Sequence, residues 1–106
     1  MPGSELVEAG RAAFARYDWP AAFEAFARAD ADTPLAVDDL ERAGLSAMWV
    51  AESDACIDFR QRAFGMRIGA GEERLAAGLA IDLCFDHAEI LRDYFHWVHT
   101  GHRRQT

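Results

Sequence analysis

The sequence repeats itself with a period of about 34 residues. When it is shifted by this distance, small residues fall on small residues and large apolar residues fall on large ones. The aligned pairs are Leu6 with Leu40, Ala9 with Ala43, Gly10 with Gly44, Ala13 with Ala47, Phe23 with Ile57 and Ala29 with Ala63. A second shift places Gly44 on Gly78. A fixed period of this length restricts the chain to a row of similar units, each packing against the next.

Within each unit, the composition and the spacing of apolar residues are those of helices. Alanine is the commonest residue, with 21 of 106, and it has the highest helix propensity. Apolar residues recur at steps of three and four, and no alternating strand pattern is present. We therefore expect an all-α fold with helices at about 4–16, 18–31, 34–50, 53–66 and from about 72 onward.

Capping residues mark where these helices begin and end. Asp18 is expected to cap the second helix, with Pro20 in the first turn, where the amide that proline lacks would be unpaired. Thr33 and Pro34 repeat this order and are expected to open the third helix. The Gly-Ala-Gly segment at 69–71 is expected to break the chain before the fifth helix.

The first unit resembles a tetratricopeptide repeat, a helix-turn-helix unit of the same period. The residues that match its signature are Ala9, Gly10, Asp18, Trp19, Ala22, Phe26, Ala29 and Pro34. The resemblance implies a single domain over 1–106, in which antiparallel helix hairpins stack as a short right-handed α-solenoid. The implied boundaries are about 4–33 for repeat 1, about 34–69 for repeat 2, about 72–99 for a partial repeat 3 and 100–106 for a tail.

The second and third units depart from this pattern. Arg60 stands where the first unit has Phe26, so the neighbouring Phe59 is expected to supply the missing bulk. In the third unit Trp97 occupies a position that is alanine in the other two, and the turn at 86–87 lacks glycine and proline. The fifth helix is therefore expected either to continue or to bend into the last segment.

Residues 44–49 and 54–64 are similar to repeats in large bacterial LuxR-type transcriptional regulators. Those proteins carry such repeats as a sensing scaffold beside a separate DNA-binding module. The similarity implies, as an alternative function, a scaffold that binds an effector or a partner protein.

Charge and hydropathy narrow the choice of partner. The net charge is −7, and all 11 basic residues are arginine. An acidic chain repels phosphate backbones, so we expect no direct binding to nucleic acid. The absence of a long apolar run or a leader pattern predicts a soluble cytoplasmic protein that does not enter membranes.

One polar stripe in the last quarter suggests a second alternative, a small metal-dependent enzyme. The stripe consists of Asp82, Asp86, Glu89, Asp93 and His96. Imidazole and carboxylate groups suit Zn, Ni or Mn, but a solvated polar face is the interpretation we favour. Cys56 and Cys84 fall in apolar surroundings and are expected to be inert core thiols. We therefore expect no catalytic residue, no metal and no cofactor.

The favoured function is a non-catalytic module that binds a protein or a peptide. In the family that the chain resembles, the first helix of each hairpin lines the concave face. The residues placed there are Arg11, Phe14, Leu45, Met48, Trp49, Leu79 and Asp82. Such a groove is apolar in the middle and suits an amphipathic helix. The apolar segment 90–98 either folds back on the stack or pairs with a second copy, and we expect a homodimer through this C-terminal helix.

Overall fold

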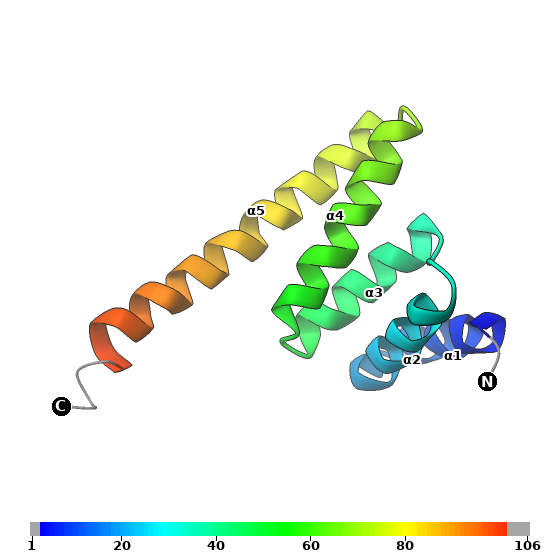
Figure 1. Ribbon diagram of the computed structural model, residues 1–106, viewed down its shortest axis with the longest axis horizontal. Coiled ribbons are helices and arrows are strands. Elements are labelled where there is room, and N and C mark those ends of the chain that lie inside the picture. The colour runs from blue at the N-terminus through cyan, green and yellow to red at the C-terminus, as the bar shows by residue number, and fades with distance from the viewer. Residues whose placement is uncertain (1–2, 102–106) are drawn as a thin grey trace.

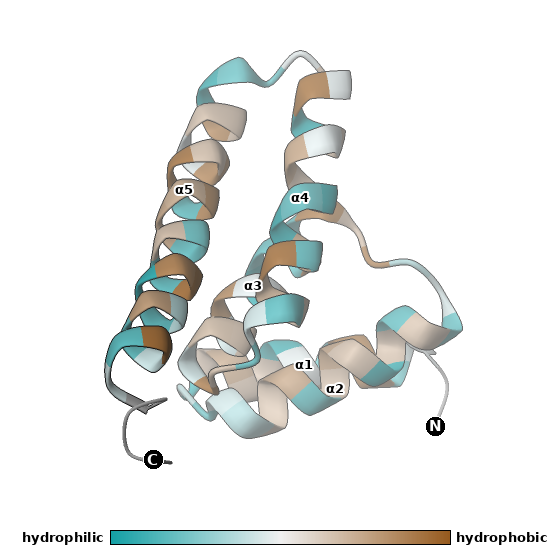
Figure 2. Ribbon diagram, turned by 60° about the vertical axis from the view of Figure 1, so that its left-hand side comes forward, coloured by the Kyte–Doolittle hydropathy of each residue, from teal (hydrophilic) through white to brown (hydrophobic). Residues whose placement is uncertain are grey.

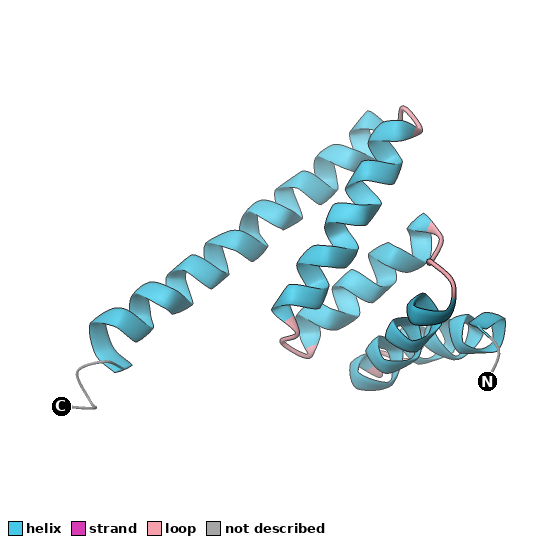
Figure 3. Ribbon diagram, in the orientation of Figure 1, coloured by secondary structure: helices cyan, strands magenta, loops and turns pink. Residues whose placement is uncertain are grey.

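Helices make up nearly all of the chain in the computed structural model, which describes residues 3–101 (Figure 1). They are α1 (Gly3–Ala15), α2 (Trp19–Asp32), α3 (Val37–Trp49), α4 (Ser53–Gly69), α5 (Glu73–His96) and the short π-helix η1 (Trp97–Gly101). No strand occurs among residues 3–101, so the expected all-α class is confirmed (Figure 3).

Consecutive helices pair through tight turns. α1 packs on α2, α3 packs on α4, and α4 packs on α5, while α2 joins the first pair to α3. Tyr17 and Ala51 lie in the first two of these turns with φ of 60° and 61°, and Gly71 lies in the third with φ of 75°. In each turn an amide bonds back to the carbonyl five residues earlier, as in a Schellman motif. The same turn geometry therefore recurs at Tyr17 and Ala51, which are equivalent positions of the first two units.

The start of α2 follows the sequence prediction. The amide of Ala21 donates to the Asp18 carboxylate at 3.3 Å, and Pro20 lies in the first turn. Because the first amides of a helix have no partner within it, this contact stabilises the helix end.

The start of α3 does not follow its prediction. The helix begins at Val37, so the prediction that Thr33 and Pro34 open it is wrong. Thr33 is extended, with φ of −145° and ψ of 131°, as the residue before a proline prefers. Leu35 is buried, and its amide donates to the Asp30 carboxylate at 3.2 Å, which holds the chain out of the helix until residue 36.

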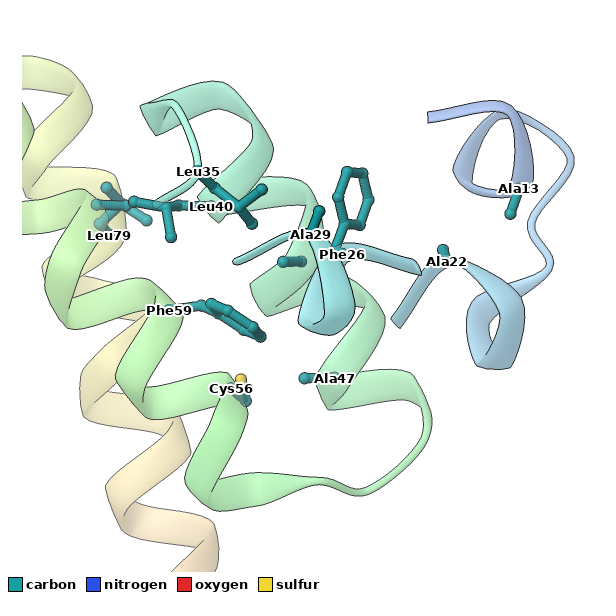
Figure 4. Close-up of a cluster of buried hydrophobic side chains, with 12 residues drawn as sticks. Ala13, Ala22, Phe26, Ala29, Leu35, Leu40, Ala47, Cys56, Phe59 and Leu79 are labelled. Carbon is teal, nitrogen blue, oxygen red and sulfur yellow. The ribbon is translucent and has the colours of Figure 1, made fainter. Parts of the chain in front are cut away.

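The core consists of small residues around a few large ones (Figure 4). Its members are Ala13, Ala22, Phe26, Ala29, Leu35, Leu40, Ala43, Ala47, Cys56, Phe59, Ala63 and Leu79. Phe26 and Phe59 are both buried, so Phe59 does supply bulk in the second hairpin as expected. From α5 only Leu79 enters this core, which therefore ends near the first third of that helix.

The fifth helix continues through residues 86 and 87 without a bend. It is a single helix of 24 residues that diverges from α4 toward its C-terminal end (Figure 1), although Glu89 and Asp93 still line a small hollow with Met48 and Ser53. The radius of gyration, 15.8 Å, exceeds the roughly 13 Å of a compact chain of about this length. None of the helices within residues 3–101 combines the length and the apolarity needed to cross a membrane.

Candidate protein-binding surface

The residues predicted to line a groove lie in several places. Phe14 of α1 and Leu45 of α3 are half-buried and line the same shallow hollow. Leu79 is buried against the core, and Asp82, one turn further along α5, is exposed. The structure thus brings Phe14 and Leu45 together and separates them from Leu79, and a common groove for all seven residues remains a prediction.

Arg11 is held by carboxylates instead of standing free. Its Nε and Nη2 donate to the two oxygens of Asp39 on α3 at 2.9 and 2.8 Å, and its Nη1 donates to Glu8 at 2.8 Å. Arg42 adds a further bond to Asp39 at 2.9 Å. Burial favours a higher pKa for Asp39, but the hydrogen bonds from Arg11 and Arg42 hold this pKa below its ordinary value. This network ties α1 to α3.

Met48 and Trp49, at the end of α3, contact different parts of the molecule. The Trp49 ring is 59% exposed and stacks on Trp19 of α2, with ring centroids 5.9 Å apart and planes inclined by 14°. The Met48 sulfur lies 3.8 Å from Nη2 of Arg60 on α4. Trp49 therefore links the two hairpins, whereas Met48 covers a polar group between α4 and α5.

A buried ion pair joins α4 to α5. Nη1 of Arg60 donates to both carboxylate oxygens of Asp86 at 2.7 and 2.8 Å, and the two side chains are only 8% and 10% exposed. The Cys56 thiol donates to the same carboxylate at 3.6 Å, and burial raises its pKa to about 11. A thiol that stays protonated at neutral pH is a poor nucleophile. This cluster therefore binds two helices together and offers no chemistry.

Sequence reasoning missed this pair. It treated Arg60 only as a departure from an aromatic position and Asp86 only as part of a polar stripe. The two residues lie 26 positions apart, and only the packing of α5 on α4 brings them together. The one signal for this ion pair in the sequence was Arg60 itself, which stands at the position that Phe26 occupies in the first unit.

The polar stripe of α5 does not gather into a metal centre. Asp86 forms an ion pair with Arg60, while Asp82, Glu89 and Asp93 are exposed. Across the described residues, no three side chains of His, Cys, Asp or Glu are placed to hold a metal ion.

The two thiols differ in their surroundings. Cys56 is buried, as expected, but Cys84 is exposed, so the prediction that it lies in the core is wrong. Of its apolar neighbours in the sequence, Phe85 faces solvent as well, because no described element covers this side of α5, whereas Leu83 is half-buried.

The outer face of α5, the side turned away from α4, is apolar and exposed. Figure 2 shows hydrophobic residues along α5 down to its last turns. The large exposed side chains on this face are Ile81, Phe85, Leu91 and Phe95, with exposures of 58, 68, 56 and 56%. A helix that is apolar beyond its packed stripe has surface left for a second neighbour.

Three glycines at equivalent positions of the 34-residue repeat show that α5 lacks a neighbouring helix at this position within residues 3–101. A Cβ on Gly10 would lie 2.9 Å from the ring of Phe26, and a Cβ on Gly44 would lie 3.0 Å from Arg60. In both hairpins the small residue thus admits a side chain of the partner helix. A Cβ on Gly78 meets no neighbouring atom within 4 Å among the described residues. α5 therefore presents the same small position to open space.

No protein-family model, no curated protein and no solved structure matches this chain.

Proposed function

We propose that this chain is a non-catalytic protein-interaction module built of tetratricopeptide-like hairpins, and that the outer face of α5 binds a helix of a protein partner. The observation that carries the proposal is the contrast among the glycines. α1 and α3 each receive a partner helix at Gly10 and Gly44, whereas the equivalent Gly78 is open. Because α5 repeats the pattern of α1 and α3, a helix is the natural occupant of its outer face.

The outer face of α5 is a better binding surface than the surface of α1 and α3. There, Arg11 and Asp39 already satisfy one another, and Trp49 is stacked on Trp19. Binding a ligand at this place would require breaking those contacts. On α5, exposed Phe85 and Leu91 offer apolar area with no such contact between helix pairs to break, and the ring contacts of exposed Phe95 are to Tyr94 and His99 nearby in the chain. The scaffold of a LuxR-type regulator, the alternative that the sequence suggests, would use the same face for its partner protein.

Site-specific photocrosslinking in cells that express the chain tests the proposal. A benzophenone side chain replaces Leu91 on the outer face, and in a matched control it replaces Asp93, which is also exposed but points about 160° away from Leu91 around the helix. We expect a discrete protein adduct from position 91 and none from position 93. If both positions give the same weak background, the outer face binds no protein and the proposal is wrong.

A further inference from the structure

The outer face of α5 contains a seam with the spacing of a coiled coil. Its residues are Ala77, Ile81, Cys84, Ala88, Leu91, Phe95 and Val98. Successive members are separated by four and three residues in alternation, a mean period of 3.5 that keeps a seam turned toward a second helix. Six of the seven are exposed, and Val98 is half-buried. The seam contains no charged residue.

We propose that the occupant of this seam is the α5 helix of a second copy of the chain, packed antiparallel in a two-fold dimer. The inference rests on the proposed function above and names its partner. A two-fold interface must be complementary to itself, so that each residue that contacts another on the second copy is contacted by it in return.

The seam meets this condition in one antiparallel register, with the two-fold axis between Ala88 and Leu91. In this register Ala88 faces Leu91 of the second copy and Cys84 faces Phe95, while Ile81 lies level with Val98 in the first turn of η1. Small residues thus lie opposite large ones in the central layers, as close packing requires. A parallel arrangement would instead place Phe95 on Phe95 and Ala88 on Ala88, leaving alternate layers crowded and empty.

Residues beside the seam are also compatible with this register. Phe85 lies beside Arg92 of the second copy, where a guanidinium can stack on the ring. His87 lies beside Tyr94. The carboxylates of Asp82, Glu89 and Asp93 are off the seam, so two chains of net charge −7 meet without acidic groups opposing one another there.

The available area fits a dimer of moderate affinity. The paired layers from Ile81 to Val98 extend over about 26 Å of helix. From the exposed fractions of the large side chains, the seam and Phe85 present on the order of 600 Å² per copy. Stable interfaces bury about 800 Å² per partner, so we expect dissociation in the micromolar range. α4 packs on the other side of α5, so the two bodies lie apart and do not collide.

Disulfide trapping tests the register. In the antiparallel pair, two Cys84 residues are about 16 Å apart along the helices, beyond the roughly 7 Å between Cα atoms that a disulfide can span. Phe95→Cys places a thiol opposite Cys84 of the second copy, and we expect mild oxidation to link the chains. His96→Cys is the control, because the next residue on a helix turns away by about 100° and should give no linked dimer. A Cys84 dimer in the unmodified chain would indicate parallel pairing, and an intramolecular link in Phe95→Cys would indicate a fold-back. Either result overturns the proposal.

Light scattering at 50 to 100 μM, an order of magnitude above the expected dissociation constant, tests the dimer itself. We expect a mass approaching twice the 11.8 kDa of one chain. Leu91→Glu should return the mass to that of one chain with an unchanged circular dichroism spectrum, whereas His96→Glu should leave the dimer intact. If the chain is monomeric and the crosslink from position 91 captures a different protein, the second copy is the wrong partner although the proposed function stands. If the chain is monomeric and no crosslink forms from position 91, both the dimer and the proposed function are wrong.

Discussion

Tyr17 and Ala51 occupy the same left-handed backbone conformation at equivalent positions of two successive units, with φ of 60° and 61°. Each lies between the two helices of a hairpin, and in both turns an amide bonds back to the carbonyl five residues earlier. Left-handed backbone costs a residue with a Cβ roughly 1 kcal/mol or more, and glycine avoids this cost. The backbone is therefore strained at the equivalent residue of two successive units, where the same turn geometry forms.

This strain predicts that Ala51→Gly stabilises the protein. We expect the free energy of unfolding in urea to rise by about 0.5–1 kcal/mol, because glycine adopts this conformation without a steric penalty. The matched control is Ala55→Gly inside α4, which should lower stability by about 1 kcal/mol. Equal losses in both variants would mean that the turn at Ala51 is not strained.

The buried pair of Arg60 and Asp86 predicts that replacing one partner lowers the free energy of unfolding much more than replacing both. Arg60→Leu leaves Asp86 buried without its partner, so we expect a loss of about 3 kcal/mol or more in urea unfolding. Replacing both residues by leucine should recover most of that loss, since an apolar pair needs no partner. Additive losses in the double variant would contradict this account.

The equivalent glycines predict opposite responses to the same change. Gly10→Ala should destabilise the chain by about 1–3 kcal/mol, because the new Cβ would meet the ring of Phe26. Gly78→Ala should stabilise it by up to about 1 kcal/mol, since alanine favours helix and the site is open. Thermal unfolding at a concentration well below the expected dissociation constant compares the two. A destabilised Gly78→Ala chain would show that something packs there within one chain.

The exposure of Trp49 predicts that this end of α3 contributes little to the core. Replacing Met48 and Trp49 together by alanine should cost about 1–2 kcal/mol, mainly the stacking on Trp19. Phe26→Ala, which empties a buried site, should cost about 3–5 kcal/mol. If the double variant unfolds as readily as Phe26→Ala, the two side chains are structural and cannot belong to a binding groove.

The depressed carboxyl pKa values predict acid sensitivity. Hydrogen bonds from Arg62 lower the pKa of Asp30, and those from Arg11 and Arg42 lower that of Asp39. A carboxyl group with a lower pKa in the folded chain stabilises it fully above the unfolded value of about 3.9, and this contribution is lost as the pH falls through the folded value. We expect unfolding free energy to drop below about pH 4. Asp39→Asn should make this drop shallower, and an unchanged slope would exclude Asp39 as a cause.

Local patterns in the sequence were sufficient for most of the secondary structure. Helix periodicity, the Asp18 cap and the break at 69–71 depend on residues within a few positions of one another, and the helices form where these patterns predict. Thr33 and Pro34 were misread because the same cap-and-proline order also suits an extended segment. The buried Leu35 and its bond to Asp30 decided between the two.

The sequence by itself determined an all-helical chain whose pattern repeats at a fixed interval, because helix formation and turn geometry depend on near neighbours. Only the tertiary structure decided which residues of α5 are covered. Asp86 is buried because Arg60 reaches it from α4, and Cys84 is exposed because no described helix lies on its side. The spacing of apolar residues shows which side of a helix can be buried, but whether a neighbour is there to bury it depends on how the helices pack.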